Sequence, residues 1–185
     1  MKNLNIGIDI DGTITSPYHY IAYLNRIYDK NLTEEEITTV FWAELYGDTL
    51  EGMLDKLHSN YLNCYSEAKV VEGAKEILDE LYKYNNLFFV TARSADLEEI
   101  THNWLKKQKL SQIPLYILGT DRKLNKAKEL KCDIFIEDNP SNALHLAEGG
   151  LKVILIDCNY NKDVKHENII RVFSWREIKD IIDKM

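Results

Sequence analysis

The feature that most constrains the fold of this chain is an apolar run that ends in two carboxylates and a glycine turn. β-Branched residues at positions 6, 8 and 10 favour an extended strand over Ile6–Ile10. A strand that is buried on both faces needs no polar alternation, as in a parallel sheet. Ligands of open α/β sheets bind outside the carboxyl ends of the strands, where Asp9 and Asp11 stand. The alternative is a hairpin, with Asp11-Gly12 as a type I′ turn between Ile6–Ile10 and Thr13–Thr15.

Composition narrows the class of protein. The 185 residues are 45% hydrophobic and 29% charged, which is typical of a soluble globular protein with one main domain. A formal net charge of −7 argues against binding of a nucleic acid polymer, although a local lysine cluster can still hold a small anion. Cys64, Cys132 and Cys158 lack paired spacing, which favours free thiols in a reducing compartment over a disulfide or zinc site. With no membrane-length apolar run and no signal-peptide pattern, we expect a cytoplasmic protein without a membrane partner.

Short apolar runs alternate with helix-sized amphipathic segments along the rest of the chain. Four runs are typical of strands: Leu87–Thr91, Leu115–Leu118, Asp133–Ile136 and Lys152–Asp157. Alternation of this kind builds a parallel sheet with helices on both faces. Together with Ile6–Ile10, these runs predict an α/β, Rossmann-like three-layer fold with a five-stranded parallel sheet.

Polar residues mark the expected helix starts. Ser94, Asp121 and Asn139-Pro140 each follow a predicted strand and precede apolar residues at near-helical spacing. Ser174 and Glu177 form a capping box for a final helix. These starts place helices between the strands and at the end of the chain.

The stretch from Ser16 to Val70 is too long for a plain loop. Apolar stripes over 18–28 and 50–61, and a capping box formed by Thr33 and Glu36, predict helices of its own. We therefore expect a core domain of residues 1–15 and 71–185, with residues 16–70 inserted after the first strand as a small helical cap.

Polar or charged residues also stand at or after the ends of the next three predicted strands, as Asp9 and Asp11 do at the first. The second strand ends in Thr91, Lys123 follows the third, and the fourth is followed by Glu137-Asp138. Because the carboxyl ends of parallel strands meet at one edge of a sheet, we expect these side chains to gather near Asp9 and Asp11. This recurrence favours a functional site over the hairpin.

These four motifs resemble those of the haloacid dehalogenase superfamily of aspartate-nucleophile phosphatases, and the resemblance covers essentially the whole chain. A narrower set of residues is similar to the cytosolic 5′(3′)-deoxyribonucleotidase family and its microbial relatives, whose short helical cap after the first motif also matches. That set is Thr91-Ala92-Arg93-Ser94, Thr101, Trp104-Leu105, and Ala127–Leu130 running into Asp133.

The resemblance implies roles for the acidic residues. Asp9 would attack phosphorus and form an aspartyl-phosphate, while Asp11 would protonate the leaving alkoxide and then activate water. Mg²⁺ would be held by Asp9, the backbone carbonyl of Asp11 and Asp138, because this ion prefers hard oxygen ligands and relieves repulsion from the substrate. Glu137 stands where the family commonly has a first aspartate, so either Glu137 or Asp138 is the direct ligand, and the shorter Asp138 is our choice.

The resemblance also implies a phosphate-binding set. The Thr91 hydroxyl and the backbone N–H groups of Ala92 and Arg93 would bind phosphoryl oxygens at a helix start. Lys123 would stabilise the charge that develops in the transition state, and Lys126, one turn later, is the alternative lysine.

The cap is expected to select the substrate. Phe41 and Trp42 are the best candidates to stack on a nucleobase, although cap aromatics also serve as core. Arg93 either contacts substrate or pairs with Asp96.

The function we predict from the sequence is Mg²⁺-dependent hydrolysis of a small nucleotide, such as a (deoxy)nucleoside monophosphate. The alternatives are a phosphatase or phosphotransferase for another metabolite such as a sugar phosphate, and a non-catalytic binding protein on the same scaffold. A receiver domain is disfavoured because its acceptor aspartate follows the third strand, where this chain has Gly119-Thr120-Asp121. A homodimer is a candidate assembly.

Overall fold

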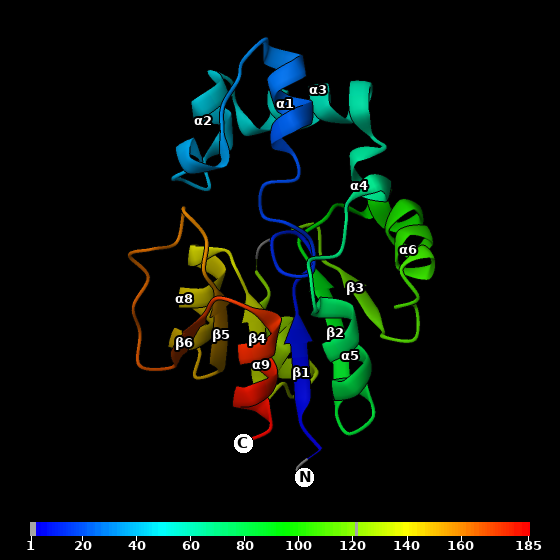
Figure 1. The fold of residues 1–185 in the computed structure, drawn as a ribbon, viewed down its shortest axis with the longest axis vertical. Helices are drawn as coiled ribbons and strands as arrows, with labels where there is room; N and C mark the ends of the chain where they lie inside the picture. The colour runs from blue at the N-terminus through cyan, green and yellow to red at the C-terminus, as the bar shows by residue number, and fades with distance from the viewer. Residues whose placement is uncertain (1–2, 121) are drawn as a thin grey trace.

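A six-stranded sheet forms the centre of the molecule. The computed structural model of the chain describes residues 3–120 and 122–185, so the expected helix cap Asp121 lies outside the described residues. The strand pairs are all parallel, in the order β3-β2-β1-β4-β5-β6 (Figure 1). The strands are β1 (Asn5–Ile8), β2 (Asn86–Thr91), β3 (Leu115–Ile117), β4 (Ile134–Glu137), β5 (Lys152–Ile156) and β6 (Ile169–Val172). The α/β class and the parallel sheet are confirmed, whereas the predicted count of five strands is wrong by one.

The central position of β1 excludes the hairpin alternative. Ile6 pairs with Leu87 of β2 on one side and with Ile134 of β4 on the other. Both edges of β1 are therefore hydrogen-bonded to parallel neighbours, and Thr13–Thr15 has no edge of β1 to pair with. Ile6 and Ile8 are fully buried, as expected for a strand covered on both faces.

The missed strand is β6, which lies at the edge of the sheet beside β5. It is four residues long, only Val172 is buried, and Arg171 interrupts its apolar residues. An edge strand needs only one paired side, so a short and partly polar segment is sufficient there.

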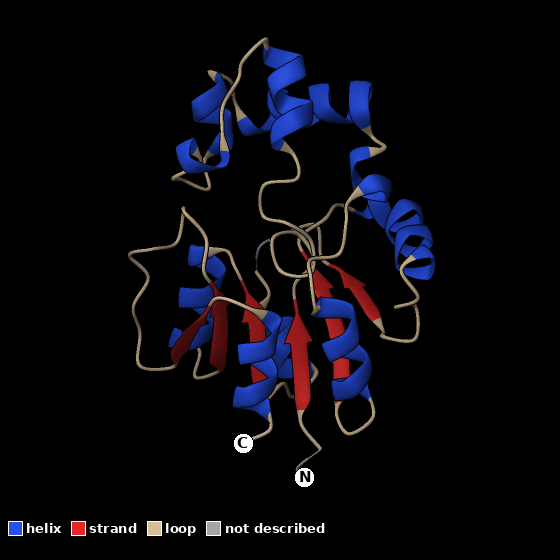
Figure 2. Ribbon diagram, viewed as in Figure 1, coloured by secondary structure: helices blue, strands red, loops and turns tan. Residues whose placement is uncertain are grey.

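Helices cover both faces of the sheet (Figure 2). The helices α5 (Ala74–Tyr82), α6 (Glu98–Lys107) and α9 (Trp175–Ile182) contribute to one apolar cluster, and α7 (Leu124–Glu129) and α8 (Pro140–Glu148) to the other. Trp104 and Ile178 are buried in the first cluster, and Phe135 and Leu146 in the second. This three-layer arrangement leaves the carboxyl ends of the strands facing the cap.

The expected helix starts are largely as the sequence indicates. Asn139 accepts a hydrogen bond from the N–H of Ser141 at 3.0 Å, with Pro140 in the first turn of α8. Ser174 accepts from the N–H of Glu177 at 3.3 Å at the start of α9. After Ser94 the chain forms a 3₁₀ turn, η2 (Ala95–Leu97), before α6 begins.

Four helices and a 3₁₀ turn lie above the carboxyl ends of the strands: α1 (Ile21–Tyr28), η1 (Glu34–Glu36), α2 (Trp42–Tyr46), α3 (Leu50–Tyr61) and α4 (Cys64–Glu67) (Figure 1). The four helices share a separate apolar cluster that includes Leu24, Tyr46, Leu57 and Tyr65. Thr15 and Val70 form an antiparallel bridge where the chain leaves the sheet and returns to it. We propose residues 16–70 as the cap, and this bridge supports the boundary.

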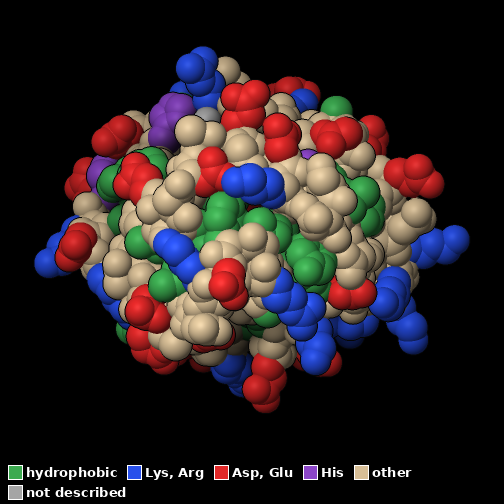
Figure 3. Space-filling model, turned by 90° about the horizontal axis from the view of Figure 1, so that it is seen from above, with side chains coloured by type: hydrophobic (Ala, Val, Ile, Leu, Met, Phe, Trp, Pro, Cys, Tyr) green, Lys and Arg blue, Asp and Glu red, His purple; other side chains and the backbone are tan. Residues whose placement is uncertain are grey.

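The distribution of surface charge and the lengths of the helices can be compared with the sequence prediction, which disfavours nucleic acid polymers and membranes as partners. Seen from above, the molecule carries acidic and basic side chains interspersed with small hydrophobic patches (Figure 3). This face has no broad basic surface in the described part of the chain. Across residues 3–120 and 122–185, no helix combines the length and apolar character needed to cross a membrane.

Candidate active site

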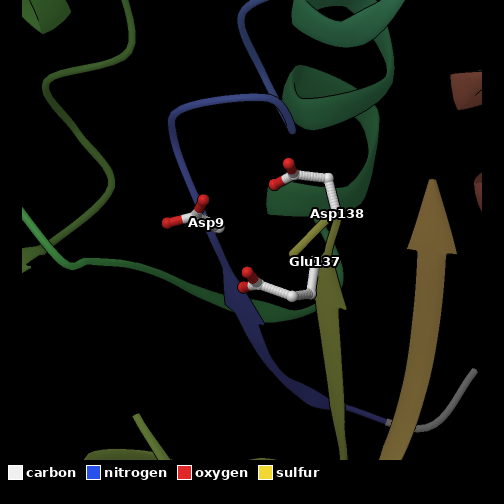
Figure 4. A group of neighbouring side chains, drawn as sticks. All are labelled: Asp9, Glu137 and Asp138. Carbon is white, nitrogen blue, oxygen red and sulfur yellow. The ribbon is translucent and has the colours of Figure 1, made fainter. Parts of the chain in front are cut away.

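Three buried carboxylates meet at the carboxyl ends of the two central strands. Asp9 follows β1, Glu137 ends β4, and Asp138 is the next residue. Because β1 and β4 are hydrogen-bonded neighbours, these ends lie side by side, and the side chains of Glu137 and Asp138 extend toward the end of β1, where Asp9 lies (Figure 4). One oxygen from each carboxylate lies within 4.8 Å of the others. We call these three residues the carboxylate cluster.

Lys123 is the cation that accompanies the carboxylate cluster. Its Nζ lies 2.5 Å from Asp9 Oδ1 and 2.9 Å from Glu137 Oε2, and the side chain is only 1% exposed. Lys126, the alternative lysine, instead pairs with Glu129 at 2.7 Å on α7. The structure therefore brings Lys123, and not Lys126, to the cluster.

The carboxylate cluster is buried and sets three carboxyl groups against the single charge of Lys123. Burial raises the pKa of Asp9 well above its usual range, against the opposing charge of Lys123. Burial, followed by the charge of Glu137, raises the pKa of Asp138 to about 7. A divalent cation would relieve this repulsion, and a set of carboxylate oxygens is the donor set that Mg²⁺ prefers. The residues present therefore fit such an ion.

The raised pKa of Asp138 predicts a pH-dependent stability. A carboxyl that binds its proton more tightly in the folded state stabilises the fold at low pH, and this contribution is lost as pH rises through about 7. In metal-free protein, we expect Asp138→Asn to gain melting temperature over wild type between pH 5 and 8, by an amount that grows with pH. Thermal melts with excess chelator measure this, with the exposed Asp55→Asn as control. A constant difference across this range would contradict the prediction.

Glu137 and Asp138 have different hydrogen-bond partners. Both oxygens of Glu137 are held by protein groups: Oε2 by Lys123, and Oε1 by the side-chain amide of Asn142 at 3.1 Å and the N–H of Asn139 at 3.3 Å. Asp138 accepts a hydrogen bond from Thr13 Oγ1 at 3.1 Å and one from the Tyr160 hydroxyl. Each carboxylate thus has a partner on both oxygens, and Glu137 in addition positions Lys123. The choice of Asp138 as the direct metal ligand stays a prediction.

Gly12 lets the opening turn approach Asp138 closely. Its φ of +87° lies in the left-handed region, and a Cβ added there would collide with the Asp138 carboxylate. The glycine of the opening motif is therefore required by both backbone conformation and space.

Asp11 lies outside the carboxylate cluster and faces the cap. Arg93 donates to both of its oxygens, from Nε at 2.8 Å and Nη2 at 2.7 Å, and the Tyr20 hydroxyl donates at 2.9 Å. Burial raises the pKa of Asp11, but the charge and hydrogen bonds of Arg93 outweigh this and lower it to about 2. The partner of Arg93 is thus Asp11, and the alternative pairing with Asp96 is wrong.

Thr91 and Ala92 border the site at the end of β2. Thr91 is buried, and its hydroxyl accepts a hydrogen bond from the N–H of Arg93 at 3.2 Å. Ala92 is exposed and lines a cavity that also reaches Asp11. In this arrangement the N–H of Arg93 is bonded within the turn, and Ala92 is at the surface that a ligand would meet.

The cavity between sheet and cap has a volume of about 470 Å³. Asp11 and Arg93 lie on its core side, and its walls include the aromatic rings of Tyr20, Trp42 and Tyr65. Phe41, the other predicted stacking residue, is 63% exposed and is not among the residues that line this cavity. The structure therefore brings only one of the two predicted cap aromatics to the site.

The fold of the chain is similar to that of haloacid dehalogenase-like proteins. A haloacid dehalogenase-like hydrolase from Streptococcus pneumoniae matches with a TM-score of 0.64 and 13% identity, over 97% of this chain and 98% of that one. Protein Tyrosine Kinase A from Mycobacterium tuberculosis matches with a TM-score of 0.72 and 12% identity, over 97% and 98%. At such low identity these likenesses show the fold alone.

Sequence comparison narrows the class to one family. Residues 2–185 match the model of the family described as 5′ nucleotidase, deoxy (pyrimidine), cytosolic type C protein, and the chain belongs to this family. A nucleotidase from Clostridium acetobutylicum is 40% identical over 185 residues, which cover 100% of this chain and 96% of that protein. The chain is thus a hydrolase acting on phosphoric monoesters.

Proposed function

We propose that the chain is a Mg²⁺-dependent phosphatase of (deoxy)nucleoside monophosphates that works through an aspartyl-phosphate on Asp9. The observation that carries this proposal is the buried group of Asp9, Lys123 and Asp138, and a cavity with aromatic walls reaches Asp11 in the same motif. The nucleotide substrate and a cytoplasmic location are supported by the description of the family.

The positions of Asp9, Asp11 and Lys123 support the following proposed chemistry. Asp9 Oδ attacks phosphorus, the ester P–O bond breaks, and the leaving oxygen takes a proton from Asp11. Water then attacks the aspartyl-phosphate and gives its proton to Asp11, which restores both carboxyl groups and releases phosphate. Lys123 neutralises Asp9 and the phosphoryl oxygens. Asp9, the backbone carbonyl of Asp11 and Asp138 would hold Mg²⁺, which would neutralise charge on the phosphoryl group.

Asp11 needs a rearrangement before it can act as an acid. Arg93 and Tyr20 hold it in the ionised form, which carries no proton to give. The Asp11–Arg93 pair therefore opens when substrate binds, and a phosphoryl group is an anion that competes for the Arg93 guanidinium.

A panel of phosphomonoesters tests the proposed activity. Phosphate release is compared for deoxyribonucleoside 5′- and 3′-monophosphates, ribonucleoside monophosphates, a sugar phosphate and an aryl phosphate, with Mg²⁺ or with chelator. We expect the highest kcat/KM for nucleotides and loss of all activity with chelator. Preference for the sugar phosphate would favour the alternative phosphatase, and no release from any ester would indicate a binding protein.

The cavity wall predicts which cap aromatic contacts the nucleobase. Trp42→Ala should raise KM for a nucleotide about tenfold, since base–aromatic stacking contributes about 1–3 kcal/mol. The adjacent Phe41→Ala is a matched control, because Phe41 is exposed and lies outside the cavity lining. Steady-state kinetics check this, with an aryl phosphate to confirm that the chemistry is intact. Equal KM changes in the two variants would contradict this role for Trp42.

A further inference from the structure

Tyr160 contacts the carboxylate cluster from outside the four motifs. Its hydroxyl donates to Oδ2 of Asp138, whereas Thr13 donates to Oδ1. Asp138 is only 4% exposed, and each of its oxygens accepts a hydrogen bond from a hydroxyl group. Each oxygen keeps a further lone pair, and the two donors fix the plane in which those lone pairs point.

The loop that carries Tyr160 is anchored to the core by Asn161, which is 1% exposed. Its side-chain amide donates to the backbone carbonyl of Asp138 at 2.7 Å and to that of Ile156 at 2.8 Å. Its Oδ1 accepts from the N–H of Cys158 at 3.1 Å and from Arg171 at 2.7 Å. The loop of residues 158–161 is thus bound to the main chain of Asp138 and to β6.

The same loop also contacts the proposed cap. The N–H of Asn159 donates to the Tyr18 hydroxyl at 2.8 Å, and the Asn159 side chain donates to the carbonyl of Glu34 at 2.9 Å. The rings of Tyr18 and Tyr160 meet edge to face with centroids 6.2 Å apart. Tyr18 therefore contacts the loop, and no hydrogen bond in the described part of the chain joins it to Asp138.

We propose that Tyr160 is a positioning residue that orients the Asp138 carboxylate for binding of the divalent cation. This inference rests on the proposed function, because it assumes that Asp138 is a metal ligand. The hydroxyl acts through Asp138 and touches neither substrate nor the reacting phosphorus. Groups that hydrogen-bond to a metal ligand typically change metal affinity by about 10–100-fold when removed. Tyr160 is therefore expected to affect the affinity for the ion more than the rate with the ion bound.

Tyr160→Phe tests this proposal, because it removes the hydroxyl and keeps the ring against Tyr18. The Mg²⁺ concentration that half-saturates the rise in melting temperature of the full chain is measured without substrate. We expect this concentration to rise about tenfold or more in Tyr160→Phe. At saturating Mg²⁺, kcat should return to within about twofold of wild type, which a general loss of structure would not allow.

Tyr18→Phe is the matched control, since it also removes one tyrosine hydroxyl from the same ring pair but leaves the bond to Asp138. Its Mg²⁺ dependence should equal that of wild type. Equal Mg²⁺ dependence in Tyr160→Phe and wild type would overturn the inference and leave the proposed function standing. A wild-type protein whose stability and activity do not respond to Mg²⁺ would overturn both.

Discussion

Asp9→Asn is expected to reduce phosphate release by on the order of 10³-fold or more, because an amide cannot serve as the attacking nucleophile. The fold should survive the change. The amide has nearly the same shape as the carboxylate, and Lys123 keeps its second partner, Glu137, at 2.9 Å. Burial already raises the pKa of Asp9, so removal of its charge relieves repulsion within the carboxylate cluster.

Phosphate release and thermal melts of the same preparation measure the two effects separately. Asp96→Asn is the control, because Asp96 is an exposed carboxylate near Arg93 in sequence that lies outside the carboxylate cluster. It should retain activity within about twofold, as expected of a surface substitution. Substantial Mg²⁺-dependent turnover in Asp9→Asn would rule out Asp9 as the nucleophile.

The parts of the site that the sequence predicted are those set by strand order and strand ends. Asp9 and Asp138 each follow an apolar strand, and parallel pairing of those strands is enough to bring the two carboxylates together. The phase of a strand is fixed once its apolar run is recognised, because its side chains alternate with a period of two. Lys123 was predicted on similar grounds, from its place at the start of a helix.

The contacts that the sequence did not reveal come from loops and from the proposed cap. Arg93 reaches Asp11 across 82 residues, and Tyr160 reaches Asp138 across 22. Neither contact can be predicted from the spacing of apolar residues. An arginine or a tyrosine in a loop has the same neighbours in sequence whether or not its side chain faces a carboxylate. Such pairs depend on how whole segments pack, which local spacing does not encode.

Local spacing also fails to show which of the two adjacent aromatic residues Phe41 and Trp42 faces the cavity. They are adjacent in sequence, yet only Trp42 lines the cavity, because Phe41 precedes α2 and Trp42 is its first residue. Successive side chains on a helix point about 100° apart. For a helix of only five residues, the apolar pattern is too short to fix which residue begins it.

Lys123→Met should be the most destabilising substitution at this site. It removes the buried cation that lies 2.5 Å from Asp9 and 2.9 Å from Glu137, and leaves the carboxylate cluster uncompensated. Breaking a buried ion pair in this way costs about 3–5 kcal/mol. The remaining carboxyls would hold protons more tightly in the folded state, so the loss should be larger at pH 8 than at pH 6. Urea unfolding of metal-free wild type and Lys123→Met at the two pH values measures this loss in the free energy of unfolding.

Two further variants separate the structural role of this lysine from its proposed catalytic role. Lys126→Met removes the neighbouring lysine, which pairs with Glu129 on α7, and should leave stability and activity nearly unchanged. The double variant Lys123→Met/Glu137→Gln removes one positive and one negative charge together, so it should recover part of the lost stability. It should not recover phosphate release, because no cation then faces the phosphoryl group. Full activity in the double variant, or loss of activity in Lys126→Met, would show that Lys123 is not the catalytic lysine.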